Sequence, residues 1–150
     1  MAPTSSGEST RAEGLAVSRA LAAVAASARP AQWVKNLVVA LPFLFGAALT
    51  TPRGWSLAAA GVVVFSVVAS GVYVVNDVVD RERDRAHPVK RHRPLASGQL
   101  AVSTALSAAV VLEAGGLLAA FLLDPAFGRW CSIYAEQRPI ALESARPCAL

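Results

Sequence analysis

Two long uncharged stretches occupy the middle of the chain. From Gly54 to Asn76 no side chain is ionisable except that of Tyr73, and residues 101–123 are interrupted only by Glu113. A helix needs about 20 mainly apolar residues to cross the hydrocarbon core of a bilayer. The pattern therefore predicts transmembrane helices over about 55–76 and 101–123.

A third uncharged stretch, residues 37–51, is shorter than the other two. It reaches membrane-spanning length if the helix also includes Trp33 at the interface and Lys35, whose amine can extend towards water. Pro42 lies inside this segment and predicts a kink in the helix. We expect this first span at about 31–49.

The composition supports a membrane protein. The 150 residues are 55% hydrophobic and 16% charged, with a mean hydropathy of +0.48. Soluble domains usually carry about 45–50% apolar and about 25% charged residues. The alternative is that these stretches are core helices of a soluble protein. A chain of 150 residues would then have to bury two long apolar helices in its interior. We therefore predict an all-α integral membrane protein with about three transmembrane helices.

The segment before the first span divides into two parts. Residues 1–14 are rich in Ser, Thr, Gly and Glu and predict a disordered tail. Residues 15–28 are rich in Ala around Arg19 and predict an interfacial helix. A signal peptide is the alternative, but two glutamates precede the apolar part and Arg19 interrupts it.

The distribution of Lys and Arg predicts the orientation in the membrane. Three arginines and Lys35 precede or begin the first span, and only Arg53 lies between the first two spans. Six basic residues lie between the second and third: Arg81, Arg83, Arg85, Lys90, Arg91 and Arg93. Cytoplasmic loops carry the excess of Lys and Arg. We expect a multi-pass protein of the plasma (inner) membrane, with its N-terminus and the 76–100 loop in the cytoplasm.

Four side chains with oxygen ligands follow the second span: Asn76, Asp77, Asp80 and Asp84. If the helix continues, the three aspartates lie along one stripe, because residues three and four apart share a face. Carboxylate and amide oxygens suit Mg²⁺, which usually also binds the phosphates of a substrate. The alternative is a solvated helix end, in which Asp77 pairs with Arg81 and Asp80 pairs with Arg83.

A basic loop comes directly after the aspartates. Lys90, Arg91 and Arg93 lie between two prolines that prevent a continuous helix. Cations beside a carboxylate–metal site suit a phosphorylated substrate, although the same charges also serve to keep the loop in the cytoplasm. His87 and His92 are interpreted as loop residues. No aromatic residues alternate with the basic ones, which argues against a nucleic-acid partner.

These residues resemble those of a known family. The pattern Asn76-Asp77-x-x-Asp80-x-x-x-Asp84 is similar to the first aspartate-rich motif of the UbiA superfamily of membrane-embedded prenyltransferases. The stretch Arg29-Pro30-Ala31-Gln32-Trp33-Val34-Lys35-Asn36 resembles one branch, the decaprenyl-phosphate phosphoribosyltransferases of the actinobacterial cell wall. The resemblance extends from about Arg29 to about Gly128.

The resemblance implies a bundle of about nine membrane helices around a polar cavity, of which residues 29–128 form the front part. It implies transfer of a phosphoribosyl group from 5-phosphoribosyl diphosphate to decaprenyl phosphate or another polyprenyl phosphate, for the synthesis of cell-wall arabinan precursors. Asp77, Asp80 and Asp84 would be the catalytic residues, holding Mg²⁺ with the help of Asn76. The phosphate-binding residues would be Lys35, Asn36, Lys90, Arg91 and Arg93.

The chain also departs from the family. No second aspartate motif occurs, and after Gly128 charges, prolines and two cysteines are scattered. We expect residues 129–150 to be an atypical tail, such as a frameshift would produce; the alternative is a genuine short extracytoplasmic tail.

The length of the chain bears on its activity. Nine spans need about 180 residues before any loops, so we expect this chain to be inactive without partner helices or further copies of itself. Two other functions stay open, namely transfer to a quinone or haem precursor and a non-catalytic membrane remnant or subunit.

Glu113, in the middle of a span, is expected to face other helices or to be protonated.

Overall fold

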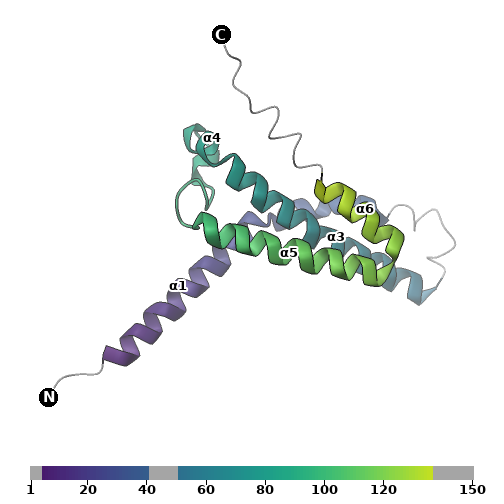
Figure 1. Ribbon diagram of the computed structural model, residues 1–150, viewed down its shortest axis with the longest axis horizontal. Helices are drawn as coiled ribbons and strands as arrows, with labels where there is room; N and C mark the ends of the chain where they lie inside the picture. Colours follow the sequence, from purple (N-terminus) through teal and green to yellow (C-terminus); the bar gives the residue numbers. More distant parts are fainter. Residues whose placement is uncertain (1–4, 41–50, 137–150) are drawn as a thin grey trace, which may run out of the picture.

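The computed structural model describes residues 5–40 and 51–136, and every element in them is helical (Figure 1). In chain order these are α1 (Ser5–Ser27), η1 (Pro30–Ala40), α3 (Pro52–Val79), α4 (Arg81–Ala86), η3 (Lys90–His92), α5 (Val102–Leu123) and α6 (Pro125–Glu136). The predicted all-α class is confirmed.

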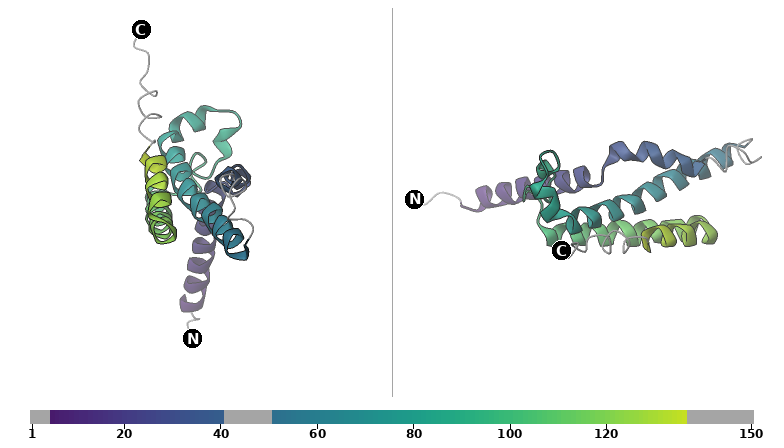
Figure 2. Two further views of the ribbon diagram at one scale, coloured as in Figure 1. Left: turned by 90° about the vertical axis from the view of Figure 1, so that its right-hand side faces the viewer. Right: turned by 90° about the horizontal axis from the view of Figure 1, so that it is seen from above.

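The helix α3 is the centre of the molecule. Thr51 starts it by accepting a hydrogen bond from the Gly54 amide at 3.1 Å, and Pro52 occupies its first turn, where no intrahelical donor is needed. Figure 2 shows η1 on one side of α3 and the helices α5 and α6 on the other. Among the described residues, two helices, α3 and α5, are long and apolar enough to cross a membrane; they cover the segments predicted as the second and third spans.

Small residues allow α5 to lie close to α3. Ala105, Ala109, Gly116 and Ala120 are buried along one side of α5. A Cβ atom added at Gly116 would lie 2.7 Å from Cγ2 of Val68, so only glycine fits there. On the other side of α5, Leu122 is 79% exposed in the isolated chain. That apolar surface is suited to lipid or to further helices.

The N-terminal segment differs from the prediction. Residues 1–14 were expected to be a disordered tail, but α1 already begins at Ser5 and projects away from the other helices (Figure 1). Its alanine-rich sequence favours helix even with few tertiary contacts. Near the end of α1, Ala23 contacts a small core around Val74 and Leu95.

The first expected span is only partly described. The segment Pro30–Ala40 is a 3-10 helix of 11 residues rather than the α-helix that a membrane span would form. Such long 3-10 segments are uncommon. Two side-chain hydrogen bonds to α3, from Trp33 and Asn36, hold it in place. Residues 41–50, including Pro42, lie outside the described residues.

The segment after Leu123 is packed, in contrast to the unrelated tail expected from residue 129. The helix α6 folds back along α5 and α3, with Cys131 only 1% exposed and the ring of Tyr134 centred 4.9 Å from that of Phe65. Apolar side chains at helical spacing make this contact, and the scattered charges obscured that signal in the sequence. Residues 137–150, with Cys148, lie outside the described residues.

Candidate functional site

The aspartate motif lies at the C-terminal end of α3. The helix ends at Val79, and Asp80 forms the junction with α4, with its amide bonded to the carbonyl oxygen of Asn76 at 2.9 Å. The side chains of Asp77 and Asp84 are buried, with exposed fractions of 4% and 3%, whereas that of Asp80 is 42% exposed. The helix therefore has a one-residue break at Asp80 instead of continuing, and Asp80 is more exposed than the other two aspartates.

Arg93 joins the two buried aspartates. Its Nη1 atom lies 3.1 Å from Oδ1 of Asp77 and 2.6 Å from Oδ2 of Asp84. The amine of Lys90 lies 3.9 Å from Oδ1 of Asp84. Both cations come from the loop between α4 and α5, which is anchored by the fully buried Leu95. The prediction that Lys90 and Arg93 lie beside the aspartates is consistent with this geometry.

Arg29 is a site residue that the sequence did not single out. It forms an ion pair with Asp77, 48 positions later, and its guanidinium lies 5.4 Å from the ring centre of Tyr73. Its backbone φ is 51°, in the left-handed region that non-glycine residues rarely adopt. Two signals were available: a buried carboxylate needs a cation, which does not select one of twelve arginines, and Arg29 opens the stretch that resembles the phosphoribosyltransferase branch.

A hydrogen-bond network fixes the turn that presents Arg29. The indole N–H of Trp33 donates to Oγ of Ser70 at 3.1 Å, and the Ser70 hydroxyl lies within bonding distance of the Ala28 carbonyl (3.1 Å) and the Ser66 carbonyl (2.7 Å). These contacts tie the chain on both sides of Arg29 to the buried face of α3. The guanidinium is therefore positioned by the fold and not only by its own ion pair.

The charge around the buried pair is unbalanced. Two carboxylates, Asp77 and Asp84, face three cations: Arg29, Lys90 and Arg93. The arginine side chains keep 29% and 28% of their surface exposed, so they meet solvent where the aspartates do not. The cluster carries a net positive charge and offers guanidinium groups to an incoming anion. Such groups bind phosphate through two parallel hydrogen bonds.

Several predicted site residues lie elsewhere or make other contacts. Asp80 pairs with Arg83 at 3.3 Å, as the solvated alternative had it. Arg91 is exposed and its Nε atom lies 3.4 Å from Nε2 of His92. For Asn76 the structure shows a half-buried side chain beside the break.

The two predicted site residues of η1 lie at a different level of the molecule. The amide of Asn36 is buried and donates to Oγ of Ser66 at 3.0 Å. Ser66 precedes Asp77 by eleven positions, which is about 16 Å along a helix. Lys35 is exposed beside Asn36. The structure therefore does not bring Lys35 and Asn36 together with the aspartates.

The donor set fits a hard divalent cation in kind. Asp77 and Asp84 supply carboxylate oxygens, the ligands that Mg²⁺ prefers. Among the described residues, no group of three acidic, His or Cys side chains is gathered as a metal site. Asp80 pairs with Arg83 instead, at 3.3 Å. His87 accepts hydrogen bonds from two loop amides, consistent with a loop residue.

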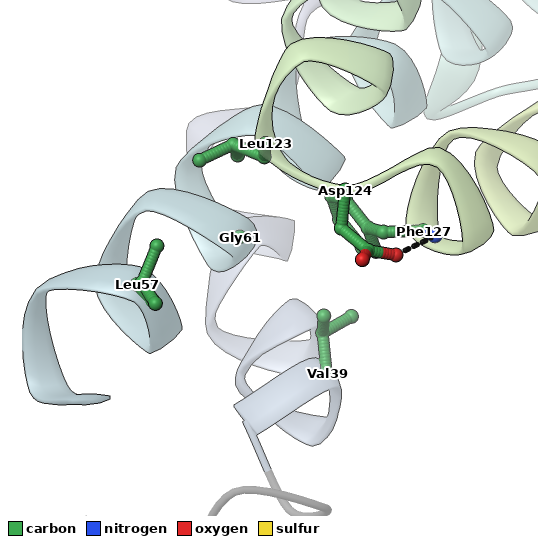
Figure 3. Close-up of a pocket in the computed structure, with 6 residues that line it drawn as sticks. All are labelled: Val39, Leu57, Gly61, Leu123, Asp124 and Phe127. Atoms are coloured by element: carbon green, nitrogen blue, oxygen red, sulfur yellow. Dashed lines mark hydrogen bonds between the residues drawn. The ribbon is translucent and has the colours of Figure 1, made fainter. Parts of the chain in front are cut away.

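An apolar cavity of about 280 Å³ lies at the other end of α3 (Figure 3). It is lined by Val39, Leu57, Gly61, Leu123, Asp124 and Phe127. Its one carboxylate, on Asp124, accepts the Phe127 amide at 2.8 Å and so caps α6. Gly61 is 16 positions before Asp77, about 24 Å along the helix, which separates the cavity from the aspartates.

Comparisons with known proteins identify the family to which the sequence is similar. The model of the UbiA prenyltransferase family matches residues 36–135. The decaprenyl-phosphate phosphoribosyltransferase of Mycobacterium tuberculosis is 44% identical over 109 residues, which are 70% of this chain and 36% of that protein. The enzyme of the same name from Corynebacterium glutamicum is 45% identical over 107 residues, covering 70% and 32%. The nodulation protein NoeC of Azorhizobium caulinodans is 43% identical over 96 residues, covering 61% and 30%.

Two further points follow from these matches. The chain spans about a third of the length of the curated relatives that it matches. The family match runs on to residue 135, beyond the limit at Gly128 expected from the sequence, and so includes most of α6. Both the packing and the match therefore join residues 129–135 to the transmembrane region.

Proposed function

Because this chain belongs to the UbiA prenyltransferase family, a family of membrane-embedded transferases, we propose that it binds the diphosphate end of 5-phosphoribosyl diphosphate. The phosphoribosyl group would then pass to a polyprenyl phosphate. The observation that carries the proposal is the buried Asp77–Arg93–Asp84 bridge, with Arg29 and Lys90 beside it. It combines carboxylates for a cation with cations for phosphates at one end of a membrane helix.

Prenyltransferases of this family generally depend on a divalent metal. In this chain Asp77 and Asp84 would hold Mg²⁺, joined by Asp80 once it leaves Arg83. When bound, the metal would neutralise the negative charge that develops on the leaving diphosphate. Lys90, Arg91 and Arg93 lie on one loop and would bind the phosphate oxygens. They also stabilise the diphosphate as it departs, because fixed cations favour the form with more negative charge.

The orientation proposed for the site is cytoplasmic. The basic loop and the end of α1 lie at the same end of α3 as the aspartates (Figure 1). Basic residues favour the cytoplasmic side. A soluble phosphorylated donor would reach the cluster from the cytoplasm of a cell with this protein in its plasma membrane, and a lipid phosphate would approach from the bilayer. The exposed apolar side of α5 would be covered by lipid, by further helices or by another copy.

The test is a binding and transfer assay with the chain in detergent micelles. We expect labelled 5-phosphoribosyl diphosphate to bind in the presence of Mg²⁺, and Asp77→Asn and Asp84→Asn each to weaken binding by about tenfold or more. Arg53→Gln is the control, since Arg53 is exposed at the start of α3, the opposite end of that helix from the aspartates.

The outcomes separate the functions under consideration. Selective binding of a prenyl diphosphate would favour transfer to a quinone or haem precursor instead. Retention of neither donor would leave a non-catalytic membrane protein and refute the proposal. Transfer to polyprenyl phosphate, measured with the chain alone, tests the separate expectation that further helices are needed.

A further inference from the structure

One oxygen atom of each buried carboxylate already accepts a hydrogen bond from an arginine. Oδ1 of Asp77 accepts from both Arg29 and Arg93, and Oδ2 of Asp84 accepts from Arg93 at 2.6 Å. The guanidinium of Arg93 therefore lies between the two carboxylates. A divalent cation that approaches this pair meets positive charge where it needs a carboxylate oxygen.

We infer that Arg29 and Arg93 are internal counter-ions that hold the place of the metal, and that they move to the diphosphate when metal and diphosphate bind together. The inference rests on the proposed function and concerns the order of loading at that site. It makes Arg29 a diphosphate-binding residue that exchanges its carboxylate partner for a phosphate. The site would then take up a metal–diphosphate complex in preference to either component alone.

The exposure of the cluster supports this exchange. The aspartates are 3–4% exposed, whereas the two arginines keep 28–29% of their surface in contact with solvent. An anion arriving from water therefore reaches the guanidinium groups before it reaches the carboxylates. Arginine is suited to the transfer because the same planar group pairs with carboxylates and with phosphates.

The backbone at Arg29 also supports it. The residue adopts a φ of 51° directly before Pro30, and such conformations persist only where the surrounding structure holds them. The contacts that hold it include the Arg29–Asp77 ion pair, the Ser70 hydrogen bond on the Ala28 carbonyl, and the hydrogen bonds of the Arg29 backbone amide and carbonyl. Only the ion pair would be given up during loading, so the turn would keep its place while the guanidinium moves.

The electrostatic balance gives the sign of the effect. A metal ion alone would displace two guanidinium groups and leave them without an anion inside a partly buried cluster, which is costly. Diphosphate supplies those groups with a new partner at the same moment. The two ligands therefore strengthen one another's binding, and by linkage the enhancement is the same in both directions.

The experiment measures Mn²⁺ and inorganic diphosphate retained by the full chain in detergent micelles, using equilibrium dialysis with both labelled. We expect the wild-type chain to retain the Mn²⁺–diphosphate complex at least about tenfold more strongly than Mn²⁺ alone. In Arg29→Gln and in Arg93→Gln, free Mn²⁺ should bind about tenfold more tightly and the preference for the complex should shrink by a similar factor. Arg53→Gln, at the opposite end of α3 from the aspartates, should match the wild type.

Two further variants keep the test sharp. Arg29→Lys and Arg93→Lys retain the positive charge and should keep free Mn²⁺ binding as weak as in the wild type. Helix content, measured by circular dichroism, identifies any variant that does not fold. If the variants at one arginine do not fold, the variants at the other arginine decide the result.

The failures are distinguishable. If the wild-type chain retains the complex but neither glutamine variant binds free Mn²⁺ more tightly, the counter-ion inference is overturned and the proposed function stands. If the wild-type chain retains neither Mn²⁺ nor the complex, the proposed function fails and the inference fails with it.

Discussion

Removal of the Arg93 side-chain charge is expected to destabilise the protein more than removal of any exposed arginine. In Arg93→Gln the two buried carboxylates, 4% and 3% exposed, lose the cation that lies between them. Breaking a buried ion pair by removing one partner costs about 3–5 kcal/mol. Arg29 still faces Asp77 and Lys90 still faces Asp84 at 3.9 Å, so we expect a loss of about 2–3 kcal/mol in the free energy of unfolding.

A native cysteine provides the assay. Cys131 is 1% exposed, so a thiol-reactive fluorophore should label it only when the helices separate. In a Cys148→Ser background, thermal unfolding in micelles then reports on the packed region. A loss of this size corresponds to a fall in melting temperature of roughly 5–10 °C. The control, Arg83→Gln, removes an ion pair whose partners are 65% and 42% exposed and should cost less than about 1 kcal/mol.

A double variant tests the electrostatic reason itself. Adding Asp84→Asn to Arg93→Gln removes one of the carboxylates left without Arg93, so part of the lost stability should return. Equal melting temperatures for Arg93→Gln and Arg83→Gln would refute the argument. So would a double variant less stable than the sum of its parts.

Three further variants test the packing. Gly116→Ala should destabilise the protein by about 1–3 kcal/mol because its Cβ would lie 2.7 Å from Val68. The control is Gly115→Ala, which has open space around it and should be neutral or stabilising by up to about 1 kcal/mol. Thermal unfolding compares the two variants. Ser70→Ala should cost about 1 kcal/mol through its contacts to Trp33 and Ala28, and the exposed Ser56→Ala much less, by the same measurement. Asn36→Ala should lower stability by about 1–3 kcal/mol without changing Mn²⁺–diphosphate retention, and weakened retention would show that Asn36 belongs to the site after all.

Much of the architecture was available from local features of the sequence. The uncharged runs identify α3 and α5 because a bilayer accepts only long apolar helices, and both begin and end close to the predicted limits. The segments that differ are those where weak local signals compete with tertiary contacts. Residues 30–40 form a 3-10 helix, and α6 packs although charges are scattered around its apolar face.

The sequence by itself determined that this is a helical membrane protein with carboxylates and cations beside the end of one span, since these are properties of composition and short spacing. Only the tertiary structure decided which charges meet. Arg29 reaches Asp77 across 48 positions through a left-handed turn, and Arg93 reaches it across 16. A one-residue break at Asp80 turns that carboxylate towards Arg83. Such pairings depend on the paths of turns and loops, which short-range periodicity does not encode.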